Sequence, residues 1–196
     1  MSTELFEDAV DSNNDSQTLR SGGCDDDRVY AEPRLEVPDF RFDDRVARCF
    51  DDMIRRSVPG YDLSLQSIAT LTQRYFQPGS TVVDLGASLG ASTLALIQGI
   101  GGREGRVLAV DNSAAMVAHL RENVSGYDGL DIAVRETDIM KTDIADASVV
   151  VLNYTLQFIE PEHRLSLMSR IAEGLRPGGI LILSEKVVFD DREEES

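Results

Sequence analysis

From residue 43 onward, short apolar runs alternate with segments of helical periodicity, and this alternation limits the chain to few folds. The strand candidates are 80–86, 105–111, 131–137, 147–155 and 179–187. The helical segments between them lie near 90–99, 113–124 and 161–174. Several apolar runs are continuous, as in strands that are buried on both faces. The order predicts an α/β fold with a mostly parallel sheet and helices on both faces.

Two further helices are predicted ahead of the first strand. In the first, apolar side chains recur at helical spacing, namely Val46, Phe50, Met53 and Ile54. SVPGY (57–61) ends this helix because proline and glycine interrupt it, and QPG (77–79) ends the second.

The formal net charge of -16 belongs mainly to the two ends of the chain. Residues 1–40 carry 11 acidic and 3 basic side chains, and residues 190–196 carry 5 acidic and 1 basic. We therefore expect a disordered acidic tail over 1–40, one domain over 41–189 and an acidic tail over 190–196. A chain this acidic is a poor candidate for direct nucleic-acid binding, which needs Lys and Arg against phosphates.

Cysteine and histidine are scarce, which argues against several kinds of site. The two cysteines, Cys24 and Cys49, form no CxxC pair and indicate free thiols in a reducing compartment. With only His119 and His163, a His/Cys metal site is not expected, and neither histidine lies in a nucleophile-elbow context. No apolar run approaches the ~18 residues of a membrane span, and the N-terminus lacks a signal-peptide pattern, so we expect a cytoplasmic protein.

The most informative stretch is VVDLGASLGAST (82–93), where a buried strand passes into a helix. Gly86 and Gly90 permit a tight turn and the close approach of a ligand at a sheet edge where ligands bind. The spacing from Asp84 is D-x-G-x-S-x-G, with Ser88 where a dinucleotide-binding G-x-G-x-x-G would have its central glycine. This form looks like the first motif of S-adenosylmethionine-dependent methyltransferases. A tight turn without a ligand is the alternative.

Acidic residues follow the next two strands. Asp111 lies more than twenty residues after the loop, where it can accept hydrogen bonds from both ribose hydroxyls. Capping of the following helix is its alternative role, but Asn112 or Ser113 can supply that cap instead. In this fold, Asp138 can accept from the adenine amino group while the N–H of Ile139 donates to the ring.

The fourth predicted strand ends in Asn153-Tyr154-Thr155 and faces the site from its other side. The side-chain amide of Asn153 can both donate and accept hydrogen bonds. It suits the methionine end of the cofactor or a substrate. The segment 153–161 could equally be a strand end and a helix entry without chemistry.

Five segments together resemble the carboxy-S-adenosyl-L-methionine synthase family, within the class I S-adenosylmethionine-dependent methyltransferase superfamily. They are FDDRVARCFDDMIRRSVPGY (42–61), VVDLGASLGAST (82–93), LAVDNSAAM (108–116), LNYTLQFIEP (152–161) and LRPGGILILSEK (175–186). The resemblance covers about residues 41–190, and SVPGY and NYTLQFIEP are more specific than the glycine loop. It implies a Rossmann-like class I methyltransferase fold and a homodimer.

The resemblance also implies an activity, in which S-adenosylmethionine is a substrate and prephenate is the carboxyl donor. Prephenate gives phenylpyruvate, carbon dioxide and the elements of water, and the methyl carbon beside the positive sulfur captures the carbon dioxide. The product, carboxy-S-adenosylmethionine, would serve a partner enzyme that makes 5-oxyacetyl-uridine at the tRNA wobble position.

Carried onto this chain, the cofactor contacts of the family fall on nine residues. They are Tyr61, Gly86, Ala87, Ser88, Asp111, Asn112, Asp138, Ile139 and Asn153. Tyr61 could otherwise be a turn aromatic that packs on the core. Ala87 stands where the family usually has Cys, and its contact would be mainly through the backbone. No catalytic residue and no metal ligand is assigned.

The printed chain ends in DDREEES (190–196), soon after the fifth predicted strand. The family continues through further strands and contains an Arg that binds the carboxylate of the product. The final strands and that Arg are therefore expected to be missing here. A small-molecule methyltransferase and a truncated, non-catalytic remnant that binds cofactor stay open as alternatives to the synthase.

Overall fold

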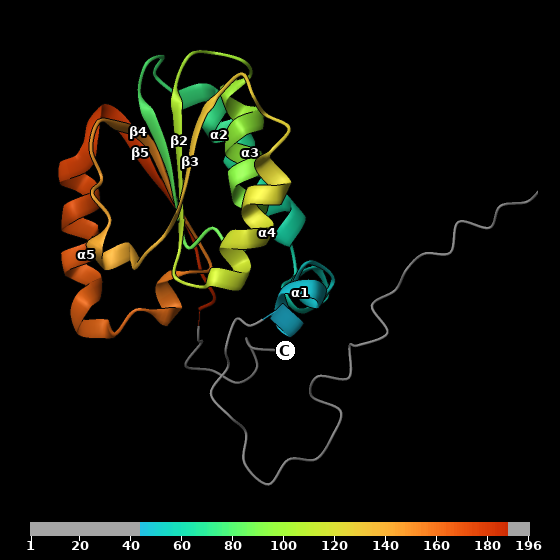
Figure 1. Cartoon of the computed structure of the whole chain (residues 1–196). Helices are drawn as coiled ribbons and strands as arrows, with labels where there is room; N and C mark the ends of the chain where they lie inside the picture. Colours follow the sequence, from blue (N-terminus) through green and yellow to red (C-terminus); the bar gives the residue numbers. More distant parts are fainter. Residues whose placement is uncertain (1–43, 188–196) are drawn as a thin grey trace, which may run out of the picture.

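The structure is a computed structural model that describes residues 44–187, with side chains for residue 50 and for residues 52–187 (Figure 1). The acidic tails predicted over 1–40 and 190–196 lie outside the described residues. In the part that is described, no helix is both long and apolar enough to cross a membrane.

Five strands form one sheet in the order β3-β2-β1-β4-β5, and all four pairings between them in the described chain are parallel. The strands are β1 Thr81–Leu85, β2 Arg106–Asp111, β3 Asp131–Glu136, β4 Ala147–Asn153 and β5 Leu175–Ser184. The chain proceeds outward from β1 to β3 and then crosses back to β4 on the other side of β1. The strand order therefore reverses between β1 and β4, where open parallel sheets bind ligands at the carboxyl ends.

Helices cover both faces of this sheet, which confirms the predicted α/β architecture. They are α1 Asp44–Ser57, α2 Tyr61–Tyr75, α3 Ala91–Ile100, α4 Ala114–Val124 and α5 Pro161–Gly174, with 3₁₀ turns η1 Ile139–Lys141 and η2 Leu156–Phe158. Figure 1 shows α2, α3 and α4 on one face and α5 on the other.

The hydrophobic core has two halves, one on each face of the sheet. Ile68 of α2, Leu96 of α3 and Leu120 of α4 are completely buried in one half. Leu167 and Ile171 of α5 are buried in the other. Successive apolar residues of β4 point alternately into the two halves, which explains its continuous apolar sequence.

The helix predicted from residue 43 is α1, and it lies beyond the lower end of the sheet in Figure 1. Its Phe50 packs with Leu89 against Met116 of α4. Phe50, Met53 and Ile54 of α1 thus lie over the carboxyl ends of the strands rather than on either face of the sheet.

The fifth strand begins at Leu175, four residues before its predicted start at residue 179. Leu175 pairs with Ala147, and the register then shifts so that Val149 pairs with Ile180. This irregularity accommodates Pro177 and a left-handed glycine at 178 (φ 79°). The predicted strand left residues 175–178 out, whereas a contact distant in sequence, from Gln77 to the Pro177 carbonyl, helps to keep this segment in the sheet.

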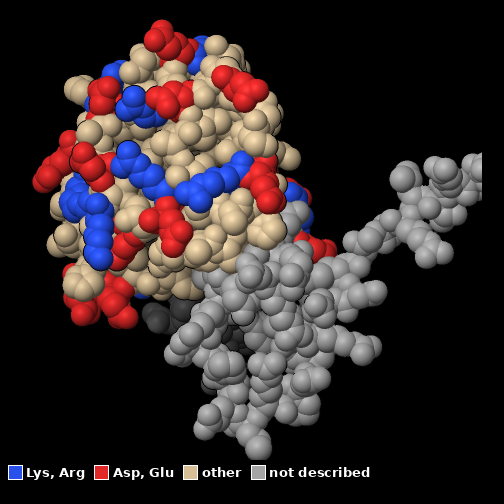
Figure 2. Space-filling view, in the orientation of Figure 1, with Lys and Arg blue, Asp and Glu red and all other residues tan. Residues whose placement is uncertain are grey.

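Charged side chains of both signs are interspersed on the face shown in Figure 2. Basic side chains run across its middle, with acidic ones above, below and between them. The face therefore presents no large uniform basic patch.

Candidate functional site

A cavity of about 470 Å³ opens at the carboxyl ends of the strands. Its lining comes from the segments after all five strands, from α1 and from the start of α2. The structure brings all nine predicted contact residues into this lining: Tyr61, Gly86, Ala87, Ser88, Asp111, Asn112, Asp138, Ile139 and Asn153. The volume is in the range of small-molecule sites, roughly 300–1,000 Å³.

The loop after β1 requires glycine for reasons of packing as well as of backbone conformation. Gly86 has φ 82°, and a Cβ there would lie 2.4 Å from Cγ2 of Thr155, which itself lines the cavity. Gly90 has φ 95°, and a Cβ there would lie 2.4 Å from Cδ1 of Leu120. The N–H groups of Gly86 and Ala87 both donate to the carbonyl of Val110, at 2.8 and 2.9 Å. The loop is therefore held against β2, β4 and α4.

Asp84 is completely buried and anchors this loop from behind, outside the cavity lining. Its Oδ2 accepts hydrogen bonds from Ser92 Oγ at 2.7 Å and Thr93 Oγ1 at 2.6 Å, both in the first turn of α3. Its Oδ1 has no hydrogen-bond partner among the described residues. Burial raises the pKa of Asp84 to about 6, and the negative charge of the nearby Asp111 adds to this rise. The hydrogen bonds from Thr93 and Ser92 lower the pKa but do not offset the effect of burial. Asp84 thus joins the end of β1 to the start of α3.

Asp111 lies at the end of β2 with its carboxylate only partly satisfied. Its Oδ2 accepts from the Ser88 N–H at 2.8 Å, and its Oδ1 accepts from the Ser113 N–H at 2.9 Å. Burial raises the pKa of Asp111, and the N–H groups of Ser113, Ser88 and Asn112 oppose that rise. Ser113 Oγ accepts from the Met116 N–H and caps α4, so Asp111 is not needed as that cap. Because a carboxylate has about four lone-pair sites, these N–H groups leave capacity for hydroxyl donors in the cavity.

Asp138 and Ile139 follow β3 at the far end of the cavity. Asp138 Oδ1 accepts from the Met140 N–H at 2.8 Å and caps η1, which leaves Oδ2 for another donor. Ile139 is 7% exposed and opens η1, where the first N–H groups have no acceptor within the turn. This pair presents an acceptor and a donor side by side.

The end of β4 carries a buried polar atom without a partner. Asn153 Oδ1 is buried, and no described residue hydrogen-bonds to it, although the side chain lines the cavity. The next residue, Tyr154, has a left-handed backbone (φ 57°) and donates its N–H to the Ser184 carbonyl at 2.8 Å. A non-glycine residue in this conformation carries strain of the kind found at functional sites.

Tyr61 combines the two roles that its sequence context left open. It is 6% exposed and packed, and it also lines the cavity. Its ring centroid lies 6.1 Å from that of Tyr154, with the two planes tilted by 35°. The guanidinium of Arg55 lies 5.9 Å from the Tyr61 ring centroid.

Several lining residues were not recognised as part of a site from the sequence. Apolar residues of α1 and of the loop after it form one wall, namely Phe50, Met53, Ile54 and Val58. Phe158 and Lys186 lie on the side of β4 and β5, next to Tyr154, which the sequence had placed facing the site. The apolar stripe of α1 and the NYTLQFIEP segment were visible signals, but their places in the cavity depend on tertiary packing. Among the described residues, no three His, Cys, Asp or Glu side chains are grouped so as to hold a metal ion.

Residues 82–179 match the model of a family described as a methyltransferase domain. Among solved structures, a candidate S-adenosyl-L-methionine-dependent methyltransferase of Methanococcus maripaludis superposes with a TM-score of 0.58 at 20% identity, over 78% of this chain and 68% of that one. The sugar N-methyltransferase KedS8 of a Streptoalloteichus species superposes with a TM-score of 0.54 at 15% identity, over 92% of this chain and 60% of that one. At these identities the likeness shows the fold, which is that of S-adenosylmethionine-dependent methyltransferases.

Two relatives of higher identity are named carboxy-S-adenosyl-L-methionine synthase. The Pseudomonas fluorescens protein is 51% identical over 173 residues, which span 86% of this chain and 70% of the relative. The Shewanella sp. (strain W3-18-1) protein is 49% identical over 166 residues, which span 84% of this chain and 68% of the relative. The predicted family resemblance is thereby confirmed, and this chain belongs to the carboxy-S-adenosyl-L-methionine synthase family.

Proposed function

We propose that this chain makes carboxy-S-adenosylmethionine and phenylpyruvate from S-adenosylmethionine and prephenate. Support comes from relatives of that name at 49–51% identity. The observation that carries the proposal is the convergence on one cavity of nine residues from segments far apart in the sequence.

The polar groups of the cavity fit an S-adenosyl ligand. Asp111 keeps acceptor capacity for ribose hydroxyls, and Asp138 with Ile139 offers the acceptor and donor that an adenine edge needs. The buried Oδ1 of Asn153 lacks a donor, which the ammonium group of the methionine portion would provide. These groups follow β3, β2 and β4 in spatial order, so the ligand would lie along the edge of the sheet.

The chemistry that S-adenosylmethionine supplies is a methyl group made acidic by the adjacent positive sulfur. In the net reaction, prephenate loses its ring carboxyl group and its hydroxyl group. A carbon–carbon bond forms between that carboxyl carbon and the methyl carbon, and the methyl proton and the departing hydroxyl form water. The chain contributes by holding the two substrates together, which is a large part of catalysis for such a step.

The residues around the reacting end suit this task. Tyr61 and Tyr154 come together beside Asn153, and apolar residues of α1 close the cavity from the other side. This wall excludes water, which would otherwise compete for a reactive carbon. The product would then serve a later step in tRNA wobble-uridine modification.

Mass spectrometry of the reaction products tests this proposal. The full chain is incubated with S-adenosylmethionine and with prephenate labelled with ¹³C in its ring carboxyl group. We expect labelled carboxy-S-adenosylmethionine and an equal amount of phenylpyruvate. S-adenosylhomocysteine formed upon addition of a small-molecule acceptor, without label transfer, would instead indicate methyl transfer. Binding of S-adenosylmethionine with neither product would indicate a non-catalytic protein.

A further inference from the structure

The charges that line the cavity are segregated along the edge of the sheet. Asp138 follows β3 and Asp111 ends β2, whereas Lys186 follows β5 at the other side. Three strand spacings separate β2 from β5, or ~14 Å at about 4.8 Å each. The cavity is therefore anionic at the end that fits ribose and adenine, and cationic at the opposite end.

Among the described residues, Lys186 is the single Lys or Arg in the cavity lining. No hydrogen bond or ion pair with any described residue engages its ammonium group. Arg55 of α1 lies outside the lining, forms an ion pair with Asp62 and lies 5.9 Å from the centre of the Tyr61 ring.

Two hydrogen bonds hold the backbone beside Lys186 against the loop after β4. The Ser184 carbonyl accepts from the Tyr154 N–H at 2.8 Å, and Glu185 Oε1 accepts from the Gln157 N–H at 3.3 Å. These contacts place Lys186 next to η2. Its long side chain keeps freedom to reach a ligand.

The η2 segment beside Lys186 adds apolar side chains to the cavity lining, namely Phe158 and Ile159. A ligand for this end would combine an anionic group for the ammonium with an apolar body for these side chains. A small carboxylate with a ring has this combination.

We propose that Lys186 binds the carboxylate of the second substrate and selects small carboxylates with an apolar body for the β5 end of the cavity. This inference rests on the proposed function for the identity of that substrate. The ammonium group offers three donors, and a charge-assisted hydrogen bond to a carboxylate is roughly twice as strong as a neutral one.

Calorimetric titration of the full chain tests this assignment. The protein is loaded with S-adenosylhomocysteine, which cannot react, and is titrated with prephenate and separately with phenylpyruvate. Lys186→Met removes the charge with little change of shape, and Lys186→Arg restores a charge. Lys141→Met is the matched control because Lys141 is the other lysine of the chain and lies outside the lining.

For Lys186→Met we expect at least tenfold weaker binding of both carboxylates and S-adenosylhomocysteine affinity within twofold of wild type. Lys186→Arg should recover most of the loss, and Lys141→Met should match wild type. The assignment would be overturned if Lys186→Met bound the carboxylates within twofold of wild type. It would also be overturned if Lys186→Arg did not recover carboxylate binding, or if wild type bound neither carboxylate.

The same variants separate this inference from the proposed function. If wild type makes carboxy-S-adenosylmethionine and Lys186→Met makes it with an unchanged KM for prephenate, only the role of Lys186 falls. If wild type makes none but the charge-dependent carboxylate binding is found, the proposed reaction falls and the role of Lys186 stands.

Discussion

The carboxyl ends of the strands lie at one side of the sheet and the amino ends at the other; we call these two sides the carboxyl edge and the amino edge. They treat polar groups in opposite ways. At the carboxyl edge, Asp111 is partly satisfied, Asn153 has a buried oxygen without a partner, and burial raises the pKa of Asp111. Such unsatisfied groups are costly in a folded chain, and they are typical of ligand sites.

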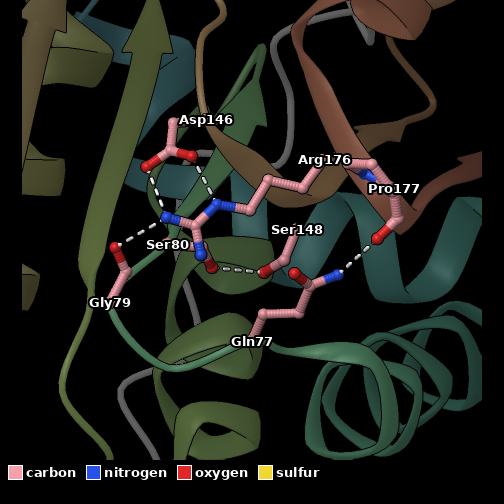
Figure 3. Close-up of polar contacts among 7 residues, drawn as sticks. All are labelled: Gln77, Gly79, Ser80, Asp146, Ser148, Arg176 and Pro177. Atoms are coloured by element: carbon pink, nitrogen blue, oxygen red, sulfur yellow. Dashed lines mark hydrogen bonds and ion pairs between the residues drawn. The ribbon is translucent and has the colours of Figure 1, made fainter.

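At the amino edge, polar groups pair with one another (Figure 3). Arg176 pairs with both carboxylate oxygens of Asp146 and donates to the Gly79 carbonyl at 3.2 Å. Ser80 and Ser148 share a hydrogen bond of 2.6 Å between their buried hydroxyls. The Arg176 guanidinium lowers the pKa of Asp146, the reverse of the shift at Asp111. The amino edge thus ties strands together, and the carboxyl edge leaves groups for a ligand.

The largest expected effect is at the carboxyl edge, with Gly86→Val. The branched side chain would meet Thr155 and would require a left-handed backbone, so S-adenosylmethionine binding should be lost. Calorimetric titration measures the affinity, and circular dichroism checks the fold. Gly129→Ala is the control because nothing lies within 4 Å of a Cβ there. If a folded Gly86→Val protein bound S-adenosylmethionine with wild-type affinity, the carboxyl edge would not be the ligand site that distinguishes it from the amino edge.

The next effect concerns the stability of the same edge as a function of pH. Because the pKa of Asp84 is raised from 3.8 to about 6, its ionised form is disfavoured in the folded state. Its contribution to the free energy of unfolding is therefore full below pH 3.8 and is lost as pH rises through about 6, with a total change of ~3 kcal/mol.

Urea denaturation of wild type and Asp84→Asn across that pH range measures this contribution. The difference in free energy of unfolding, wild type minus variant, should fall as pH rises. Since Asn does not titrate, carboxyl groups that do not interact with Asp84 cancel in the difference, which reports Asp84 together with its coupling to Asp111. A constant difference would mean that Asp84 does not change its ionisation as burial requires.

A comparable loss of ligand affinity is expected for Asp111→Ala. Removing an ionised acceptor of ribose hydroxyls should weaken S-adenosylmethionine binding by ~1.5–3 kcal/mol, the scale of charged hydrogen bonds. Asp143→Ala, at an exposed loop position outside the cavity lining, should leave the affinity at the wild-type value. Equal affinities of the two variants would sink the ribose assignment.

The smallest effect is expected at the amino edge, with Arg176→Met. Its ion pair with Asp146 is exposed, and such pairs contribute little to stability. A slightly lower melting temperature with unchanged S-adenosylmethionine affinity would sharpen the contrast between the two edges. A clear loss of affinity would show that the amino edge also shapes the site.

The parts of the fold that depend on local pattern could be predicted from the sequence. Continuous apolar runs marked the strands, and the carboxyl ends of parallel strands must meet at one edge, so residues as distant as Gly86 and Asn153 could be expected together. The start of β5 could not be predicted from the sequence. Gln77 donates to the Pro177 carbonyl and Arg176 pairs with Asp146, and these contacts between residues far apart in the chain hold the segment in the sheet. The same holds for Lys186 and for the α1 wall, since only tertiary packing brings them to the cavity.

Mass spectrometry of small molecules released by denaturing the purified protein tests the central claim most directly. The claim is that the carboxyl edge holds a carboxylated S-adenosyl compound. Wild type, purified after exposure to S-adenosylmethionine and prephenate, should release carboxy-S-adenosylmethionine, and Gly86→Val should release none. Release of no carboxy-S-adenosylmethionine by wild type, or equal release by Gly86→Val, would contradict the account.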